Sequence, residues 1–135
     1  MGFLAVIVAT IAAFAFGAGW YGFLAKPWMA DSGVPVGEDG KPQNAASPVP
    51  YVTCFIAQIF VAGMLRLLLE NVGVTGIGNA IQWGAAVGLF FITPWLALTN
   101  GYTMRPLRLT AIDGGYATIG CAIMAGVLFW LAPGL

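Results

Sequence analysis

Residues 51–71 read YVTCFIAQIFVAGMLRLLLEN and combine two properties that conflict in a membrane. The stretch is long and apolar enough to cross a bilayer as one helix, since about 20 such residues span the hydrocarbon core. It nevertheless carries Gln58, Arg66 and Glu70, which share one helical face at about 100° per residue. An arginine at bilayer depth costs about 2.5–3.5 kcal/mol, so we expect this face to pack against other helices of the chain.

The composition is that of a membrane protein. Of the 135 residues, 60% are hydrophobic and 7% are charged, and the mean hydropathy is +0.90, whereas about a quarter of a soluble domain is charged. Five basic and five acidic residues cancel, which excludes a basic surface for nucleic acid. The chain has no histidine, which excludes histidine-ligated haem or zinc. We therefore expect a lipid bilayer as partner and no nucleic acid, metal or cofactor.

Four apolar stretches account for most of the chain, and each is long enough to cross a bilayer. We predict one all-α domain over residues 1–135, a bundle of four transmembrane helices with a polar loop at 30–50. The connection 71–76 is short, so the second and third helices are predicted to form an antiparallel hairpin. The four predicted helices cover residues 3–25, 51–70, 77–98 and 111–132.

Three of these helices carry a small residue at every fourth position. Such rows let helix backbones approach closely in a membrane, where packing rather than the hydrophobic effect drives association. Three rows are more than a four-helix core needs, so they favour association with further helices. The rows are Ala5, Ala9, Ala13 and Gly17; Gly76, Ala80, Gly84 and Gly88; and Gly114, Thr118, Ala122 and Gly126.

Proline, aromatic and capping residues mark the predicted helix ends. Pro27 and Trp28 indicate that the first helix stops at the membrane interface. Pro94 is predicted to bend or break the third helix near its end. Thr110 and Asp113 have the spacing of a capping box, with Thr110 as N-cap and Asp113 stabilised by the helix dipole. The alternative interpretation makes Asp113 an intramembrane carboxylate on a proton or cation path.

The basic residues of the connections predict the orientation of the chain. They lie in the first and third connections, whereas the second connection has none. The positive-inside rule then predicts that residues 26–50 and 99–110 are cytoplasmic and that both termini face outward. We expect the protein in a bacterial inner membrane. The basic residues concerned are Lys26, Lys41, Arg105 and Arg108.

Gln58, Arg66, Glu70, Asn79 and Gln82 form a predicted polar cluster inside the membrane. Arg66 and Glu70 are four residues apart and can form a salt bridge on one helix. In a structural role, the pair hydrogen-bonds to Asn79 and Gln82 and fixes the register of two helices, at about 0.6 kcal/mol per polar contact. In a functional role, Arg66 faces an anionic solute or a lipid headgroup.

A second group of residues lies where the first helix ends and the last begins. The motifs are Gly19-Trp20-Tyr21-Gly22 with Lys26 and Trp28, and Asp113-Gly114-Gly115-Tyr116. With these motifs, four helices, a long first connection and a short second one, the sequence resembles the small membrane family catalogued as domain of unknown function 1761. The resemblance implies a four-helix membrane fold and no particular activity. It also implies an inner-surface cluster whose members share a role, namely Trp20, Tyr21, Trp28, Asp113 and Tyr116.

The sequence lacks hydrolytic and nucleotide-binding motifs, so no catalytic residue is predicted. It favours a non-enzymatic packing module that acts as a homo-oligomer or as an accessory subunit of a larger membrane complex. The alternative is a small solute or ion transporter, or a channel component, lined by the polar cluster and Asp113. An enzyme acting on lipids or quinones is the third interpretation, with Tyr116 beside Asp113 as its candidate pair.

Overall fold

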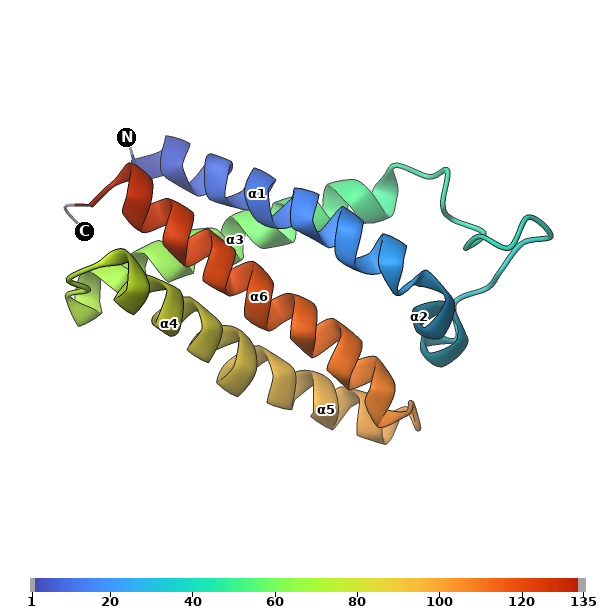
Figure 1. Ribbon diagram of the computed structural model, residues 1–135. Coiled ribbons are helices and arrows are strands. Elements are labelled where there is room, and N and C mark those ends of the chain that lie inside the picture. Colours follow the sequence, from blue (N-terminus) through green and yellow to red (C-terminus); the bar gives the residue numbers. More distant parts are fainter. Residues whose placement is uncertain (1, 134–135) are drawn as a thin grey trace.

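The computed structural model describes residues 2–133, and this part of the chain is helical without any strand (Figure 1). Four helices are long and apolar enough to cross a membrane: α1, α3, α6 and the continuous span built from α4, η1 and α5. The predicted all-α fold with four membrane-spanning helices is confirmed. The elements are α1 (Gly2–Phe23), α2 (Ala25–Ser32), α3 (Val49–Val72), α4 (Ile77–Val87), the π-helical η1 (Gly88–Ile92), α5 (Thr93–Tyr102) and α6 (Leu107–Leu131).

Helix α6 is the centre of the bundle. It lies between α1 and the α4–α5 span and contacts every other helical element (Figure 1). Its buried residues include Gly114, Gly120 and Gly126, which allow neighbouring helices to approach from several sides. Helix α3 packs on both α1 and α6, and Leu65 and Leu128 fill the core where these helices meet.

The small-residue rows are used inside the chain. Ala9 of α1 is fully buried. A Cβ added at Gly84 would lie 2.3 Å from the carbonyl oxygen of Cys121, and one added at Gly88 would lie 2.4 Å from that of Ala117. Real Cβ atoms do not approach so closely, so α4 and η1 are in direct backbone contact with α6. Because the bundle itself accounts for these rows, they no longer favour association with further helices.

Helix α6 begins earlier than the sequence suggested. The prediction that Thr110 caps this helix is wrong, because the helix starts at Leu107 and extended Pro106 precedes it. A proline fits there, since its missing N–H would have no partner in the first turn. Thr110 lies within the helix, where its hydroxyl accepts a 3.0 Å hydrogen bond from Asn100 Nδ2. Asp113 is consequently in the second turn, beyond the first turn where the dipole acts.

The third span continues past Pro94 to Tyr102 instead of breaking. A proline inside a helix removes an N–H and crowds the preceding turn. The wider turn η1 lies directly before it, and the Thr93 N–H bonds to the carbonyl oxygen of Gly88, five residues back. The Thr93 hydroxyl donates to the same oxygen at 2.7 Å. The predicted interruption therefore takes the form of a π-turn within one long helix.

Residues 25–32, where the sequence predicted the end of a helix and then a loop, form the separate helix α2. Pro27 does not stop a helix here but lies in the first turn of α2, where a missing N–H leaves no partner unsatisfied. Gly33 ends α2 in the left-handed conformation with φ 72°. The guanidinium of Arg105 lies directly against Gly33, so the turn before α6 supports the end of α2.

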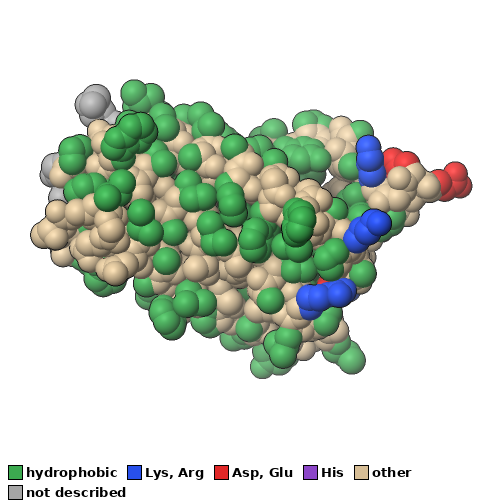
Figure 2. Space-filling view, viewed as in Figure 1, with side chains coloured by type: hydrophobic (Ala, Val, Ile, Leu, Met, Phe, Trp, Pro, Cys, Tyr) green, Lys and Arg blue, Asp and Glu red, His purple; other side chains and the backbone are tan. Residues whose placement is uncertain are grey.

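The two ends of the bundle differ in character. Helix α1 begins and α6 ends at one end, together with the α3–α4 turn; we call this the terminal end (Figure 1). The other end holds α2, the connection 33–48 and the α5–α6 turn, and we call it the loop end. On the face shown in Figure 2, the charged side chains gather at the loop end. Helix α4 packs mainly on α6 and little on α3, so the pairing of α3 with α4 as a hairpin stays a prediction.

Candidate functional site

The structure brings together the residues of the inner-surface cluster at the loop end. The Tyr21 hydroxyl donates to Asp113 Oδ1 at 2.7 Å. The Tyr21 ring meets Trp28 of α2 and Tyr116 of α6 edge to face, with centroids 6.0 and 5.3 Å apart. Trp20 Nε1 donates at 2.9 Å to the carbonyl oxygen that precedes Asp113 in α6. Three helices thus contribute to one half-buried group around a carboxylate.

Tyr116 extends this group toward the middle of the bundle. Its hydroxyl donates to the carbonyl oxygen of Ala13 at 2.9 Å and accepts a 2.5 Å hydrogen bond from Gln58 Nε2. The same amide nitrogen lies 3.2 Å from Cys54 Sγ. Gln58 Oε1 is buried and has no hydrogen-bond partner within residues 2–133. Gln58 therefore joins the loop-end group rather than Arg66, and we call the combined set the loop-end network.

Glycines create the space that the aromatic rings occupy. A Cβ at Gly17 would lie 2.7 Å from the Tyr116 hydroxyl oxygen, and one at Gly115 would lie 2.7 Å from Cζ2 of Trp20. Phe16 stacks on Tyr116, with centroids 6.3 Å apart and planes 13° from parallel. Sequence reasoning assigned neither Phe16 nor these glycines to the site. The available signals were the place of Gly17 in a small-residue row and of Gly115 in the motif that follows Asp113.

At the terminal end, Arg66 and Glu70 form the predicted salt bridge, with Nη2 and Oε1 3.1 Å apart. The Arg66 guanidinium turns toward α1, where a Cβ at Gly2 would lie 1.1 Å from Nη1. Asn79 is half-buried and Gln82 is exposed. Among the described residues, no hydrogen bond joins either amide to Arg66 or Glu70. The predicted polar cluster is thus divided between the two ends of the bundle.

An ion pair holds α2 over the loop-end network. Arg108 Nη2 donates to Asp31 Oδ1 at 2.8 Å, and the two side chains are 59% and 10% exposed, respectively. This hydrogen bond from Arg108 holds the pKa of Asp31 below its usual range. Because the guanidinium is largely in solvent, added salt should weaken the pair.

We expect the docking of α2 to weaken in acid. The pKa of Asp31 is lower in the folded than in the unfolded chain, where it is about 3.9. The pair therefore stabilises the fold fully above about pH 4 and loses this effect as the pH falls through the lowered value. Hydrogen–deuterium exchange at the α2 amides, corrected for intrinsic rates, should rise only below that pH. In Asp31→Asn the exchange should already be faster at neutral pH and show no such step; a step of unchanged size would contradict the assignment.

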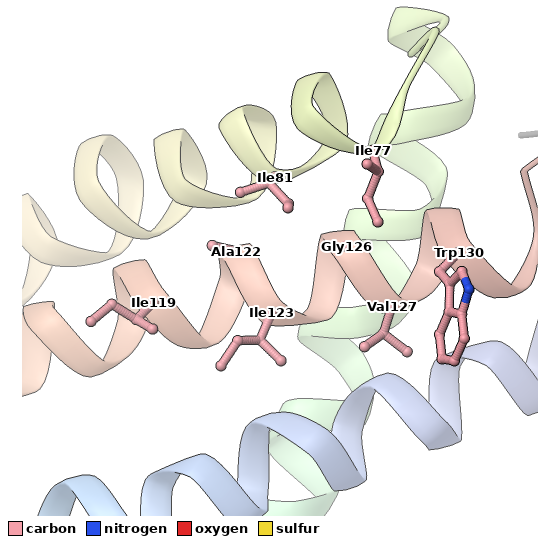
Figure 3. Close-up of a pocket in the computed structure, with 8 residues that line it drawn as sticks. All are labelled: Ile77, Ile81, Ile119, Ala122, Ile123, Gly126, Val127 and Trp130. Atoms are coloured by element: carbon pink, nitrogen blue, oxygen red, sulfur yellow. The ribbon is translucent and has the colours of Figure 1, made fainter.

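Two grooves in the described part of the bundle are lined by apolar side chains. One lies between α4 and α6, holds about 340 Å³ and is lined by apolar side chains such as Ile77, Ile123 and Trp130 (Figure 3). Another, of about 420 Å³, lies along α3 and includes Met64 and Val87. Both cysteines are free thiols. In the part of the chain that the structure describes, no three Cys, Asp or Glu side chains gather so as to hold a metal ion. Within the bundle, the polar groups that could act chemically are therefore those of the loop-end network and of the Arg66–Glu70 pair.

Comparison with known proteins gives a family match. Residues 4–129, almost the whole chain, match the family described as Protein of unknown function (DUF1761). No curated protein matches the chain, and no solved structure matches it. The match therefore identifies the family, which agrees with the membrane-like helical fold, but it assigns no activity.

Proposed function

The chain belongs to the DUF1761 family, as its motifs predicted, and from this premise we propose that it is a non-enzymatic membrane module that works by associating with other membrane helices. The association would produce a homo-oligomer or add an accessory subunit to a larger membrane complex. The observation that supports this proposal is the outer face of α1.

Helix α1 carries small residues on two faces. The row from Ala5 to Gly17 is buried inside the bundle. The second set is exposed, and a Cβ added at either of its glycines would meet nothing within 4 Å. Lipid chains gain nothing from small side chains, whereas small residues four apart let the backbone of a partner helix approach. The exposed set is Ala15, Ala18, Gly19 and Gly22.

The division of the polar residues favours association over a transport path. A path for a solute or an ion needs polar groups through the whole thickness of the membrane. Here the loop-end network and the Arg66–Glu70 pair are separated along α3 by Ala62 and Leu65, which are 0% and 2% exposed. Thr10 of α1 is fully buried, and its hydroxyl donates a hydrogen bond to the carbonyl oxygen of Val6 in its own helix, so it is not available to a solute.

The proposed orientation follows from charge. The basic residues of the connections all belong to the loop end, and positively charged connections remain in the cytoplasm. We therefore place the loop end at the cytoplasmic face of a bacterial inner membrane, with both termini outward. The residues that support this placement are Lys26, Lys41, Arg105 and Arg108.

We expect the double variant Gly19→Leu/Gly22→Leu to be released as a monomer from the assembly that the wild-type chain forms. The new side chains have free space within the chain, so the fold should persist, while a partner helix would be pushed away. Native mass spectrometry in mild detergent measures the assembly, and thermal unfolding checks the fold.

Gly63→Leu on α3 is the matched control, because a Cβ at Gly63 also meets nothing within 4 Å. This variant should keep the assembly intact. A wild-type chain found only as a monomer, with nothing co-purifying, would refute the proposed association. An assembly that survives in the double variant would refute the role of the outer face of α1.

A further inference from the structure

We propose that Asp113 and the aromatic rings beside it bind a small organic ammonium group. Free amines carry this group, and so do the choline and ethanolamine headgroups of phospholipids. The inference does not depend on association with other helices.

Among the residues that the structure describes, no cationic side chain pairs with the carboxylate of Asp113. Within residues 2–133, the salt bridges join Arg66 to Glu70 and Arg108 to Asp31. Asp113 is half-buried, and the hydrogen bond to its Oδ1 comes from the neutral hydroxyl of Tyr21. A partly desolvated charge is costly unless it is paired.

The structural explanation suggested by the sequence does not apply to Asp113. A carboxylate in a capping box bonds to the N–H of the cap residue and gains from the helix dipole. The helix starts at Leu107, and Asp113 lies in its second turn, so neither benefit reaches it. Of the basic side chains at the loop end, Arg108 binds Asp31 and Arg105 lies against Gly33, while Lys26 is exposed and no salt bridge among residues 2–133 joins it to Asp113.

The rings next to the carboxylate supply the second half of an ammonium site. Tyr21 bonds Asp113 through its hydroxyl and meets Trp28 and Tyr116 edge to face. Phe16 continues the series between Tyr116 and Trp20, with centroids 6.3 and 5.9 Å away. An ammonium group is attracted to ring faces within about 6 Å and to a carboxylate. A hard metal cation would instead need several oxygen ligands.

The position of the site fits a ligand at the membrane surface. Trp28 of α2 and Asp113 in the second turn of α6 are both partly exposed, and α2 packs against α6 at the loop end. One residue, Leu24, joins α2 to α1 with non-helical torsions of φ −102° and ψ 19°. The Arg108–Asp31 pair, which is largely in solvent on the arginine side, fixes the other end of α2. An ammonium group can therefore reach the carboxylate from the headgroup layer or from the aqueous phase.

The test is a titration of the full chain in detergent with tetramethylammonium chloride, followed by tryptophan fluorescence. We expect a saturable change that sodium chloride at equal ionic strength does not produce. Asp113→Asn keeps an acceptor for Tyr21 but removes the charge, so it should weaken binding at least about tenfold. Trp28→Leu should weaken it as well, while Glu70→Gln, which neutralises a carboxylate at the other end, should bind like wild type. Thermal unfolding of each variant confirms that it is folded.

Vesicles distinguish the two sources of the group. If a headgroup occupies the site, phosphatidylcholine vesicles should raise the apparent Kd for tetramethylammonium at least about tenfold over phosphatidylglycerol vesicles. If a free amine is the ligand, the two Kd values should agree once each is corrected for the surface potential of its vesicles, because anionic phosphatidylglycerol concentrates cations at the membrane. A titration with no saturable change, or one equal for sodium, would overturn the proposal. Binding unchanged in folded Asp113→Asn would overturn it too.

Discussion

The Gly88→Ala variant is expected to lose about 3 kcal/mol or more of stability, because its third span can no longer pack against α6. The added methyl would lie 2.4 Å from both the carbonyl oxygen of Ala117 and the Cα of Thr118. Both are backbone atoms in the middle of a 25-residue helix. They cannot turn away as a side chain can, so one helix must move as a whole.

Unfolding by denaturant in detergent micelles measures this loss. Gly78→Ala is the matched control, because it makes the same change in the same span at a position where a Cβ meets nothing within 4 Å. Its stability should stay within about 0.5 kcal/mol of wild type. A Gly88→Ala protein as stable as the control would show that α6 and η1 are not in backbone contact.

The spans could be read from the sequence because length and hydropathy are local properties. The small-residue rows correctly identified close packing, as the burial of Ala9 and Gly84 shows. They could not identify the partner helix, because a row of small residues indicates that its helix packs closely against another helix but not which one. The central place of α6 therefore emerged only from the structure. The predicted start of α6 was too late, because Thr110 fits a capping pattern. In the structure α6 begins at Leu107, directly after Pro106.

The candidate site was predictable in part for a similar reason. Helical periodicity placed Gln58 and Arg66 toward one face, and both side chains do turn inward to other helices. Helical periodicity gives the direction of a side chain around the helix axis but not its position along the axis. Gln58 and Arg66 are eight residues apart, which is about 12 Å along the helix. Gln58 therefore meets Tyr116, whereas Arg66 meets the start of α1. The glycine that admits the Tyr116 ring, Gly17, was visible only as one member of a row.

Gly17→Ala is expected to cost about 1–3 kcal/mol in the wild-type background, and much of this cost should disappear when Tyr116 is also truncated. The added methyl would lie 2.7 Å from the Tyr116 hydroxyl oxygen and 2.8 Å from Cζ. The ring must then shift, which breaks its hydrogen bonds with Ala13 and Gln58. Because the obstacle is a side chain, Tyr116→Ala removes it and leaves room for the methyl.

The prediction for Gly17 can be tested against Gly88, because the two glycines face different kinds of atoms. A double-mutant cycle compares the stabilities of wild type, Gly17→Ala, Tyr116→Ala and the double variant. If the two losses were additive, the double variant would lose the sum of the single losses; we expect it to lose about 1–3 kcal/mol less than that sum. Strict additivity would mean that Gly17 does not make room for the ring. At Gly88 no truncation of a side chain can give such a rescue, since the nearest atoms belong to the backbone. A rescue at Gly17 and none at Gly88 would show that Gly17 makes room for a side chain of the loop-end network, whereas Gly88 makes room for the backbone of a neighbouring helix.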